Sequence, residues 1–309
     1  MDSLLRMRFS ICVDPGRPWP EILALAEAAE AVGFDRVYAC DHFIPSTADG
    51  DDAPGFMLEG WTIVAALGAC TKRIGLGTLV LGNTYRHPAV VANMAATLDC
   101  VTSGRFVLGL GAGWQTNEHT AYGIDLPPPA TRLDRLEESC QVIRMLLTKE
   151  VSNFSGDWYR LTDARCDPKP VSRLPLLIGG AGERRTLRIA ARFADEWHMW
   201  ASPAEFRRKN AVLDQHCAEV GRDPATLLRS TGGSVCLSTK DDAAGGRGEG
   251  SSVVSEATDV VAKRLVEYRT AGASEFIVRD DRAQPLVQTL KTLSLLATDV
   301  LPICDERPV

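Results

Sequence analysis

The feature that most constrains this chain is a regular alternation of short apolar runs with longer amphipathic runs, repeated eight times over 309 residues. The short runs are rich in Val, Ile, Leu and Phe, which is typical of buried strands. The longer runs have helical spacing, and in 18–32 one face carries Ile22, Leu25, Ala26, Ala29 and Val32. Strands that alternate with helices predict a parallel sheet.

The pattern places each element within a few residues. Strands are predicted at 7–13, 36–40, 73–81, 105–111, 175–180, 196–200, 227–238 and 275–278. Helices are predicted at 18–32, 60–70, 88–101, 132–147, 183–193, 203–220, 256–271 and 285–299. A hairpin insertion is expected at 151–161, after the fourth helix, with Gly156 and Asp157 at its turn. The polar, glycine-rich segment 239–254 follows the seventh strand and is expected to be a flexible loop.

Eight strand–helix units fit a single closed (β/α)₈ barrel, the TIM barrel, and the chain is somewhat longer than the roughly 250 residues typical of that fold. We therefore expect one domain over 1–309. Periodicity alone leaves an open, doubly wound sheet as an alternative, because the same alternation also builds that architecture.

Composition excludes several classes of function. The net charge is −6 and no basic block is present, which argues against a nucleic-acid partner. No stretch is long and apolar enough to span a membrane, and 1–18 lacks the features of a signal peptide, so a cytoplasmic location is expected. The nine cysteines are scattered without a CxxC pair, so neither disulfides nor a metal site is expected.

In a barrel of this kind the functional site forms from the loops that follow the strands. The chemically useful residues at those positions would crowd one rim. They are Asp41, His42, Thr78, Asn83, Arg86, His87, Gly111, Gly113, Trp114, Asn117, Glu118, Gly179, Gly180, Gly182, Trp197, His198 and Trp200. An isolated Asp41–His42 pair is more often a turn cap beside a buried histidine, but its place at a strand end favours a functional role.

Two glycine-rich runs follow strands. GLGAG at 109–113 does not fit the GxGxxG dinucleotide pattern, and its glycines permit a close approach of backbone to a ligand or to another loop. IGGAGE at 178–183 joins a strand to a helix, so its backbone N–H groups favour a phosphate, the alternative being a tight turn without a ligand. Trp197 and Trp200 suit either the core or the wall of an aromatic ligand. His87, His119 and His216 are expected to be structural or exposed.

Several segments in the same order resemble the luciferase-like monooxygenase superfamily, and most closely its branch that uses the deazaflavin coenzyme F420. They are CDHFIP (40–45), the run from GTLVLGNTYRHP to GLGAGWQTNE (77–118), YGIDLP (122–127) and LLIGGAGERRTLRIAARFADEWHMW (176–200). The likeness extends from the first strand to about residue 235, roughly three quarters of the chain. The resemblance implies the same (β/α)₈ barrel, with the cofactor ring across the carboxyl ends of the strands.

The resemblance also implies site residues. His42 matches an acid/base histidine, and Glu118 offers a second catalytic carboxylate. A non-prolyl cis peptide is implied at Leu79–Val80, behind the ring. The implied cofactor-binding residues are Asp41, Thr78, Leu79, Val80, Asn83, Gly111, Gly113, Trp114, Gly179, Gly180, Ala181, Gly182, Glu183 and Trp197.

Two departures restrict what the resemblance implies. In the sugar-phosphate dehydrogenases of this branch a catalytic glutamate occupies the position of Trp114, and an active-site tryptophan occupies that of Ser46. The sequence therefore predicts hydride transfer between coenzyme F420 and a small organic substrate, but not sugar-phosphate oxidation by that mechanism.

Two alternatives remain at this stage. One is a monooxygenase that uses FMN and needs a flavin reductase as partner. The other is a non-catalytic flavin-binding protein. A homodimer is usual in the family and is expected here, and loop 239–254 is expected to close over the site.

Overall fold

The computed structural model describes residues 6–171, 173–237, 253–254 and 258–302. Within them, eight strands of a nine-stranded parallel sheet form a closed barrel, because β3 pairs with β5 as well as with β2. The closed barrel confirms the predicted fold class and removes the open-sheet alternative. The strands are β1 (Arg8–Val13), β2 (Arg36–Ala39), β3 (Gly75–Thr78), β5 (Phe106–Gly111), β8 (Leu176–Gly179), β9 (Glu196–His198), β10 (Leu228–Gly233) and β13 (Glu275–Arg279).

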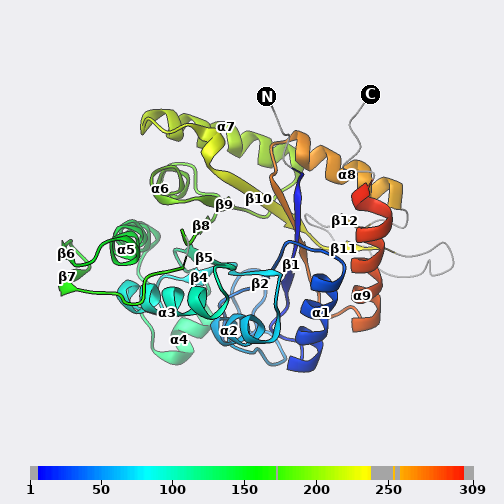
Figure 1. Cartoon of the computed structure of the whole chain (residues 1–309), viewed down its shortest axis with the longest axis horizontal. Helices are drawn as coiled ribbons and strands as arrows, with labels where there is room; N and C mark the ends of the chain where they lie inside the picture. Colours follow the sequence, from blue (N-terminus) through cyan, green and yellow to red (C-terminus); the bar gives the residue numbers. More distant parts are fainter. Residues whose placement is uncertain (1–5, 172, 238–252, 255–257, 303–309) are drawn as a thin grey trace.

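Helices surround the barrel because each buries one apolar face against it (Figure 1). In α1, Ile22, Leu25, Ala26 and Ala29 are buried as the spacing predicts, while Val32 is the C-cap of the helix and is partly buried against the core. The helices are α1 (Trp19–Ala31), α2 (Gly60–Cys70), α3 (Pro88–Val101), α5 (Pro129–Thr148), α6 (Thr186–Phe193), α7 (Pro203–Glu219), α8 (Thr258–Thr270) and α9 (Leu286–Leu295), with shorter turns at η1 (Pro224–Thr226) and η2 (Leu296–Val300).

Several predicted elements differ from the observed ones, and the helix expected at 285–299 is α9 followed by the π-helical turn η2. The strand expected at 73–81 ends at Thr78 and resumes as β4 (Leu81–Gly82). The strand expected at 227–238 divides into β10 and β11 (Val235–Cys236). The segment after β5 contains a further helix, α4 (Thr116–Tyr122), for which the sequence predicted no element. Its sequence, TNEHTAY, has too few apolar residues to show helical periodicity.

The insertion between α5 and β8 is an antiparallel pair, β6 (Ser152–Ser155) with β7 (Arg160–Ala164). It lies at the left edge of Figure 1, beside α5. Most of the loop expected at 239–254 lies outside the described residues, so its closing role stays a prediction. Its last two residues form β12 (Val253–Val254), which pairs with β11.

The interior of the barrel has two different ends. At the amino ends of the strands, Arg36 binds Glu196 at 2.7 and 2.9 Å and Glu275 at 3.2 Å, and both glutamates are buried. Above this ion cluster lies a layer of mainly apolar side chains, Cys12, Tyr38, Leu79, Val107, Leu177 and Ile277. Because charged and apolar groups fill the amino end, a site that opens to a ligand belongs at the carboxyl end.

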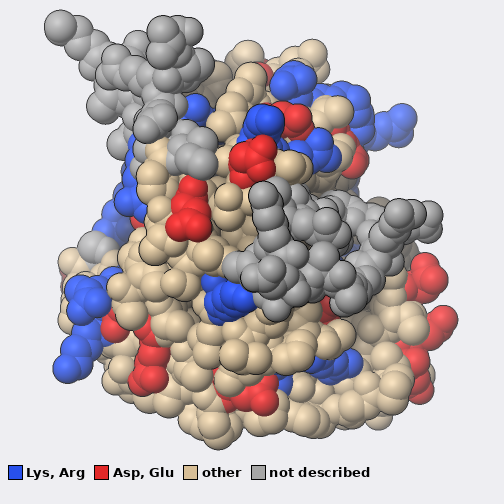
Figure 2. Space-filling view, turned by 90° about the vertical axis from the view of Figure 1, so that its right-hand side faces the viewer, with Lys and Arg blue, Asp and Glu red and all other residues tan. Residues whose placement is uncertain are grey.

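On the surface, acidic and basic side chains are interspersed over the face shown in Figure 2. Among the described residues, no helix is both long and apolar enough to cross a membrane. No group of His, Cys, Asp or Glu in the described part of the chain is arranged to hold a metal ion.

Candidate active site

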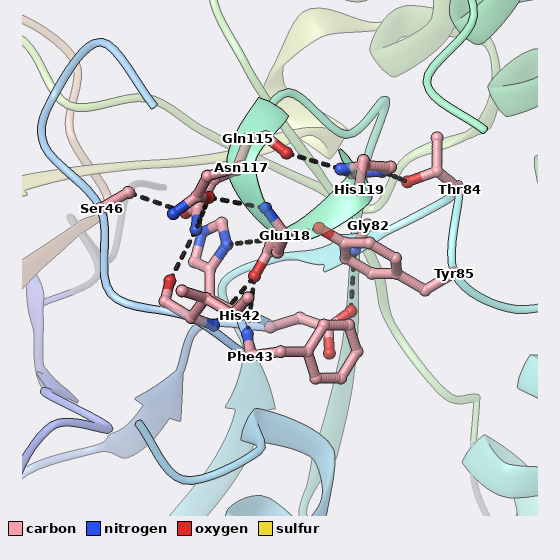
Figure 3. A network of polar contacts seen from close by, with 12 residues as sticks. His42, Phe43, Ser46, Gly82, Thr84, Tyr85, Gln115, Asn117, Glu118 and His119 are labelled. Carbon is pink, nitrogen blue, oxygen red and sulfur yellow. Dashed lines mark hydrogen bonds and ion pairs between the residues drawn. The ribbon is translucent and has the colours of Figure 1, made fainter. Parts of the chain in front are cut away.

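A histidine and a glutamate meet at the carboxyl end of the barrel, where the sequence places them on different elements. His42 follows β2, and Glu118 lies on α4, the helix after β5. The Nδ1 atom of His42 lies 2.8 Å from Oε1 of Glu118 (Figure 3). Glu118 is fully buried, whereas the His42 side chain is 19% exposed, so only His42 is open to a ligand.

Four donors surround the Glu118 carboxylate. Oε1 accepts from His42 Nδ1 and from the Tyr85 hydroxyl, and Oε2 accepts from the backbone N–H of Phe43 at 2.7 Å and of Ile44 at 3.3 Å. Burial by itself raises the pKa of Glu118, but these hydrogen bonds together lower it below its ordinary value. The carboxylate therefore stays ionised and accepts a hydrogen bond from Nδ1–H of His42, which leaves Nε2 of that ring without a hydrogen-bond partner among the described residues.

Asp41, the other member of the predicted pair, has a different role. Its two oxygens bind both terminal nitrogens of Arg86, at 2.8 and 3.0 Å, and one also accepts from the Gly82 N–H at 3.0 Å. Burial raises the pKa of Asp41, although Arg86 and Gly82 oppose the rise. Both oxygens of Asp41 therefore have protein partners, and through Gly82 this residue holds β4 in place; its contact with the cofactor ring stays a prediction.

The expected cis peptide is present at Leu79–Val80, between β3 and β4. The Val80 side chain turns toward β5 and β8, where three glycines make room for it. A Cβ at Gly111 would lie 2.7 Å from a Val80 methyl carbon, one at Gly179 2.9 Å, and one at Gly109 3.0 Å. These glycines therefore allow a bulge to fill the mouth of the barrel, a reason that their spacing alone does not reveal.

Two more predicted cofactor-binding residues, Thr78 and Asn83, differ in whether their side chains already have hydrogen-bond partners. The Thr78 hydroxyl donates to the Gly109 carbonyl at 3.0 Å and accepts from the Gly109 N–H at 2.9 Å, so it ties β3 to β5. The Asn83 backbone donates to the Gly111 carbonyl, but its side-chain amide has no hydrogen-bond partner among the described residues. Asn83 is therefore the one of the two whose side chain is free to bind a ligand.

The predicted phosphate loop, 179–183, is held from behind by other elements. The Trp197 indole N–H donates to the Gly180 carbonyl at 2.8 Å, and Lys209 donates to the Ala181 carbonyl at 2.8 Å. Glu183 turns toward α7, where Lys209 and Arg208 lower its pKa to about 2. Its carboxylate is thus neutralised and points away from the loop. The helix starts at Thr186, three residues later than expected.

The tryptophans have different environments. Trp197 is fully buried and stacks on Phe206 at 5.5 Å, so its ring belongs to the core between the barrel and α7. Trp200 points into the barrel, edge-on to His198 at 4.6 Å. The sequence left both tryptophans open between core and ligand wall; because side chains alternate along a strand, the spacing of 198 and 200 is the signal that could have separated Trp200 from Trp197. Trp114 is 48% exposed and lies edge-on to His42 at 5.7 Å, after Gly113.

His198 was noted only for its position and carries an unpaired buried atom. Its Nδ1 lies 3.0 Å from the Ser230 hydroxyl, which donates its own proton to the Trp197 carbonyl at 3.3 Å. Nδ1 is therefore the protonated nitrogen, and Nε2 is an acceptor without a partner among the described residues. Burial lowers the pKa of His198 to about 3, so the ring is neutral.

The three histidines expected to be structural or exposed have structural roles. His87 accepts from Ala89 N–H and caps α3. His119 is bound on both ring nitrogens, by Gln115 and Thr84, and His216 by Glu183 and Glu219. Tyr85 and Arg86, in contrast, complete the site, and neither was singled out as catalytic from the sequence. Both belong to the YRHP run that follows β4.

The carboxyl end of the barrel fits an aromatic, hydrogen-bonding cofactor. Among the described residues it holds a buried acceptor on His198 and a side-chain amide on Asn83 that have no hydrogen-bond partner, and a glycine-lined bulge at Val80. These are neutral groups suited to the edge and face of a flavin-type ring.

The sequence of this chain is similar to those of known proteins. The family model for luciferase-like monooxygenases matches residues 4–247. An F420-dependent glucose-6-phosphate dehydrogenase of Nakamurella multipartita is 42% identical over 176 residues, which are 57% of this chain and 50% of the relative. The pyrimidine monooxygenase RutA of Allorhizobium ampelinum is 41% identical over 140 residues, 45% of this chain and 38% of the relative. The chain thus spans about half the length of the curated relatives it matches first.

A solved structure supports the fold over the whole chain. An F420-dependent secondary alcohol dehydrogenase, in complex with an F420–acetone adduct, superimposes with a TM-score of 0.83 at 20% identity, covering 98% of this chain and 100% of the other. The family match covers most of the sequence, and the barrel, its cis bulge and its strand-end histidine agree with the resemblance found in the sequence. This chain belongs to the luciferase-like monooxygenase family.

Proposed function

We propose that this protein transfers hydride between coenzyme F420 and a small organic substrate, and that His42 carries the accompanying proton. The observation that carries the proposal is the His42–Glu118 pair, which sets an orienting carboxylate behind a partly exposed histidine at the strand ends. The relatives named for coenzyme F420 support the choice of cofactor.

The residues of the chain divide the work between binding and proton transfer. Val80 would lie behind the ring, Asn83 and His198 would bind its polar edge, and the loop 179–182 would bind a phosphate through backbone N–H groups. When bound, the deazaflavin would supply a ring carbon that accepts or donates hydride. Because the hydrogen bond to Glu118 keeps a proton on Nδ1 of His42, Nε2 would take the proton that the substrate loses on oxidation and return it on reduction.

The substrate is proposed to be other than a sugar phosphate. The position of the catalytic glutamate in the sugar-phosphate dehydrogenases carries Trp114, whose exposed ring lies beside His42. Ser46, at the position of their active-site tryptophan, donates instead to Gln115 at 2.9 Å. An exposed indole beside the proton carrier favours an apolar or aromatic group on the substrate.

Titration of the purified protein with coenzyme F420 and with FMN, followed by fluorescence quenching or calorimetry, tests the cofactor. Micromolar or tighter binding of F420, with FMN much weaker, is expected. Preferential binding of FMN, with oxygen consumption when reduced FMN is supplied, would replace this proposal by the monooxygenase alternative. The similarity to the pyrimidine monooxygenase RutA supports that alternative. Tight F420 binding without hydride transfer to any substrate in a broad panel would leave a cofactor-binding protein.

The remaining expectations concern the whole protein and stay predictions. They are a single domain over 1–309, a cytoplasmic location, a homodimer, and closure of loop 239–254 over the site. A flavin reductase is a partner only under the FMN alternative.

A further inference from the structure

Tyr85 shares an oxygen atom with the proposed proton carrier. Its hydroxyl donates to Oε1 of Glu118, the same atom that accepts from Nδ1 of His42 (Figure 3). The two donors therefore divide one oxygen, while backbone N–H groups occupy the other. A carboxylate oxygen with two donors holds each of them less strongly than an oxygen with one, because each donor withdraws part of its negative charge.

The Tyr85 ring is fixed in this position by its neighbours. It stacks on His119 at 4.7 Å and lies edge-on to Phe43 at 4.9 Å. His119 is itself fixed through both ring nitrogens. Gly82 lies under the ring, and a Cβ there would approach it to 2.5 Å. The surrounding contacts thus hold an aromatic ring at this point, in an orientation that directs the Tyr85 hydroxyl to Glu118.

Tyr85 also keeps its proton. Burial and the nearby Glu118 raise its pKa well above the ordinary value. The other charged groups around it are Asp41 and Arg86, which neutralise each other through two hydrogen bonds. The hydroxyl is therefore a permanent donor to Glu118 over the pH range in which a histidine titrates.

We propose that Tyr85 is a positioning residue that sets the proton affinity of His42 by competing with it for Oε1 of Glu118. Removing the hydroxyl concentrates the carboxylate charge on the bond to His42, which stabilises the imidazolium. Loss of Tyr85 as a donor then makes His42 a stronger base and a weaker acid. The inference takes from the proposed function only the statement that His42 carries the proton.

The test is the titration of His42 followed by NMR on its ring C–H signals, assigned with the His42→Gln variant. Tyr85→Phe is expected to raise the His42 pKa by roughly half to one unit, which is about a three- to tenfold gain in proton affinity. Tyr122→Phe is the matched control, since Tyr122 packs on the same Phe43 ring but its hydroxyl makes no hydrogen bond to Glu118. An unchanged or lowered pKa in Tyr85→Phe overturns the proposal.

Two further measurements separate this role from a purely structural one. In a Glu118→Gln background, Tyr85→Phe is expected to leave the His42 pKa unchanged, because the shared carboxylate is gone. A full shift in that background would show that Tyr85 acts by another route. If Tyr85→Phe does not fold, incorporation of 3,5-difluorotyrosine at position 85 supplies a stronger donor, and the His42 pKa is expected to fall. None of these titrations needs cofactor or substrate, so their result is independent of whether the proposed reaction is correct.

Discussion

His42 and Glu118 differ in exposure, and this difference separates their expected effects. We predict that His42→Ala lowers kcat by about 10²–10⁴-fold, because general acid–base catalysis is lost, and leaves the Kd for F420 nearly unchanged. Glu118→Gln keeps a neutral acceptor for Nδ1 and is expected to lower kcat less, while moving the pH profile to lower pH. Steady-state kinetics and cofactor titration check both. Unaltered turnover in His42→Ala would remove it from the mechanism.

The buried ring of His198 makes stability depend on pH. Its folded pKa is about 3 and the ordinary value is 6.5, so the unfolded chain binds a proton first as pH falls. Stability is therefore complete above pH 6.5 and declines below it, by about 1.4 kcal/mol per pH unit down to pH 3.

We predict that urea unfolding at pH 6.5 and pH 5 shows a smaller pH-dependent loss in His198→Gln than in the wild type. His87→Asn is the control, because His87 is exposed and Asn keeps a cap for α3. Equal losses in wild type and His198→Gln would contradict the argument.

At the level of single residues, the sequence predicted positions better than partners. A place after a strand was enough to select His42 and Glu118, since the fold directs those loops to one rim. It could not show that Asp41 pairs with Arg86, or that Tyr85 donates to Glu118. Those pairings depend on the path of β4 and α4 in space, and neither element was visible as a separate unit in the apolar pattern.

Among the elements, the bulge between β3 and β4 depends on the glycines of its neighbours. We predict that Gly179→Ala destabilises the fold by about 1–3 kcal/mol and weakens cofactor binding, because its Cβ would lie 2.9 Å from both Val80 methyl carbons. Adding Val80→Ala should restore part of the stability, since it removes those carbons. Thermal unfolding of the two single variants and the double variant measures this coupling. Strictly additive effects would show that the two side chains do not compete for space.

The elements that the sequence predicted well are those with a strong period. The helix 88–101 agrees with α3 to the residue, because Pro88 opens it and its apolar face is continuous. The strand at 73–81 was predicted as continuous. Leu79, Val80 and Leu81 are all apolar, so the pattern gave no sign that the strand is interrupted there. The helix α4 was not predicted because its own sequence is polar and shows no apolar period. The contacts that bury Glu118 and His119 come from distant parts of the chain.

For the molecule as a whole, eight repeats of strand and helix sufficed to predict the barrel and the end that carries the site, but not the side chains that fill the amino end. The ion cluster at the amino end joins Arg36 of β2, Glu196 of β9 and Glu275 of β13. These residues lie up to 239 positions apart in the sequence, so no local pattern connects them. Their assembly stabilises one end of the barrel, while the chemistry is proposed at the other.

Because the ion cluster stabilises the amino end of the barrel, Arg36→Met is expected to affect stability. The variant leaves two buried carboxylates with Arg8, at 3.4 and 3.7 Å, as a remaining cationic partner among the described residues, and is expected to lose about 3–5 kcal/mol of stability. Arg173→Met is the matched control. The Arg173 side chain is 82% exposed in its ion pair with Asp195, so a loss of at most about 1 kcal/mol is expected. Urea unfolding of both variants provides the comparison.

The same variant tests whether the two ends of the barrel act independently. Arg36 lies at the end opposite to His42, so Arg36→Met should keep the wild-type His42 pKa and, below its unfolding temperature, the wild-type kcat. Substituting Glu196 and Glu275 by Gln in the Arg36→Met background removes the unpaired charges and should recover part of the lost stability. A shift of the His42 pKa in Arg36→Met would show instead that the charge at the amino end reaches the site through the barrel, because the apolar layer of Cys12, Leu79, Val107, Leu177 and Ile277 between them screens it too weakly.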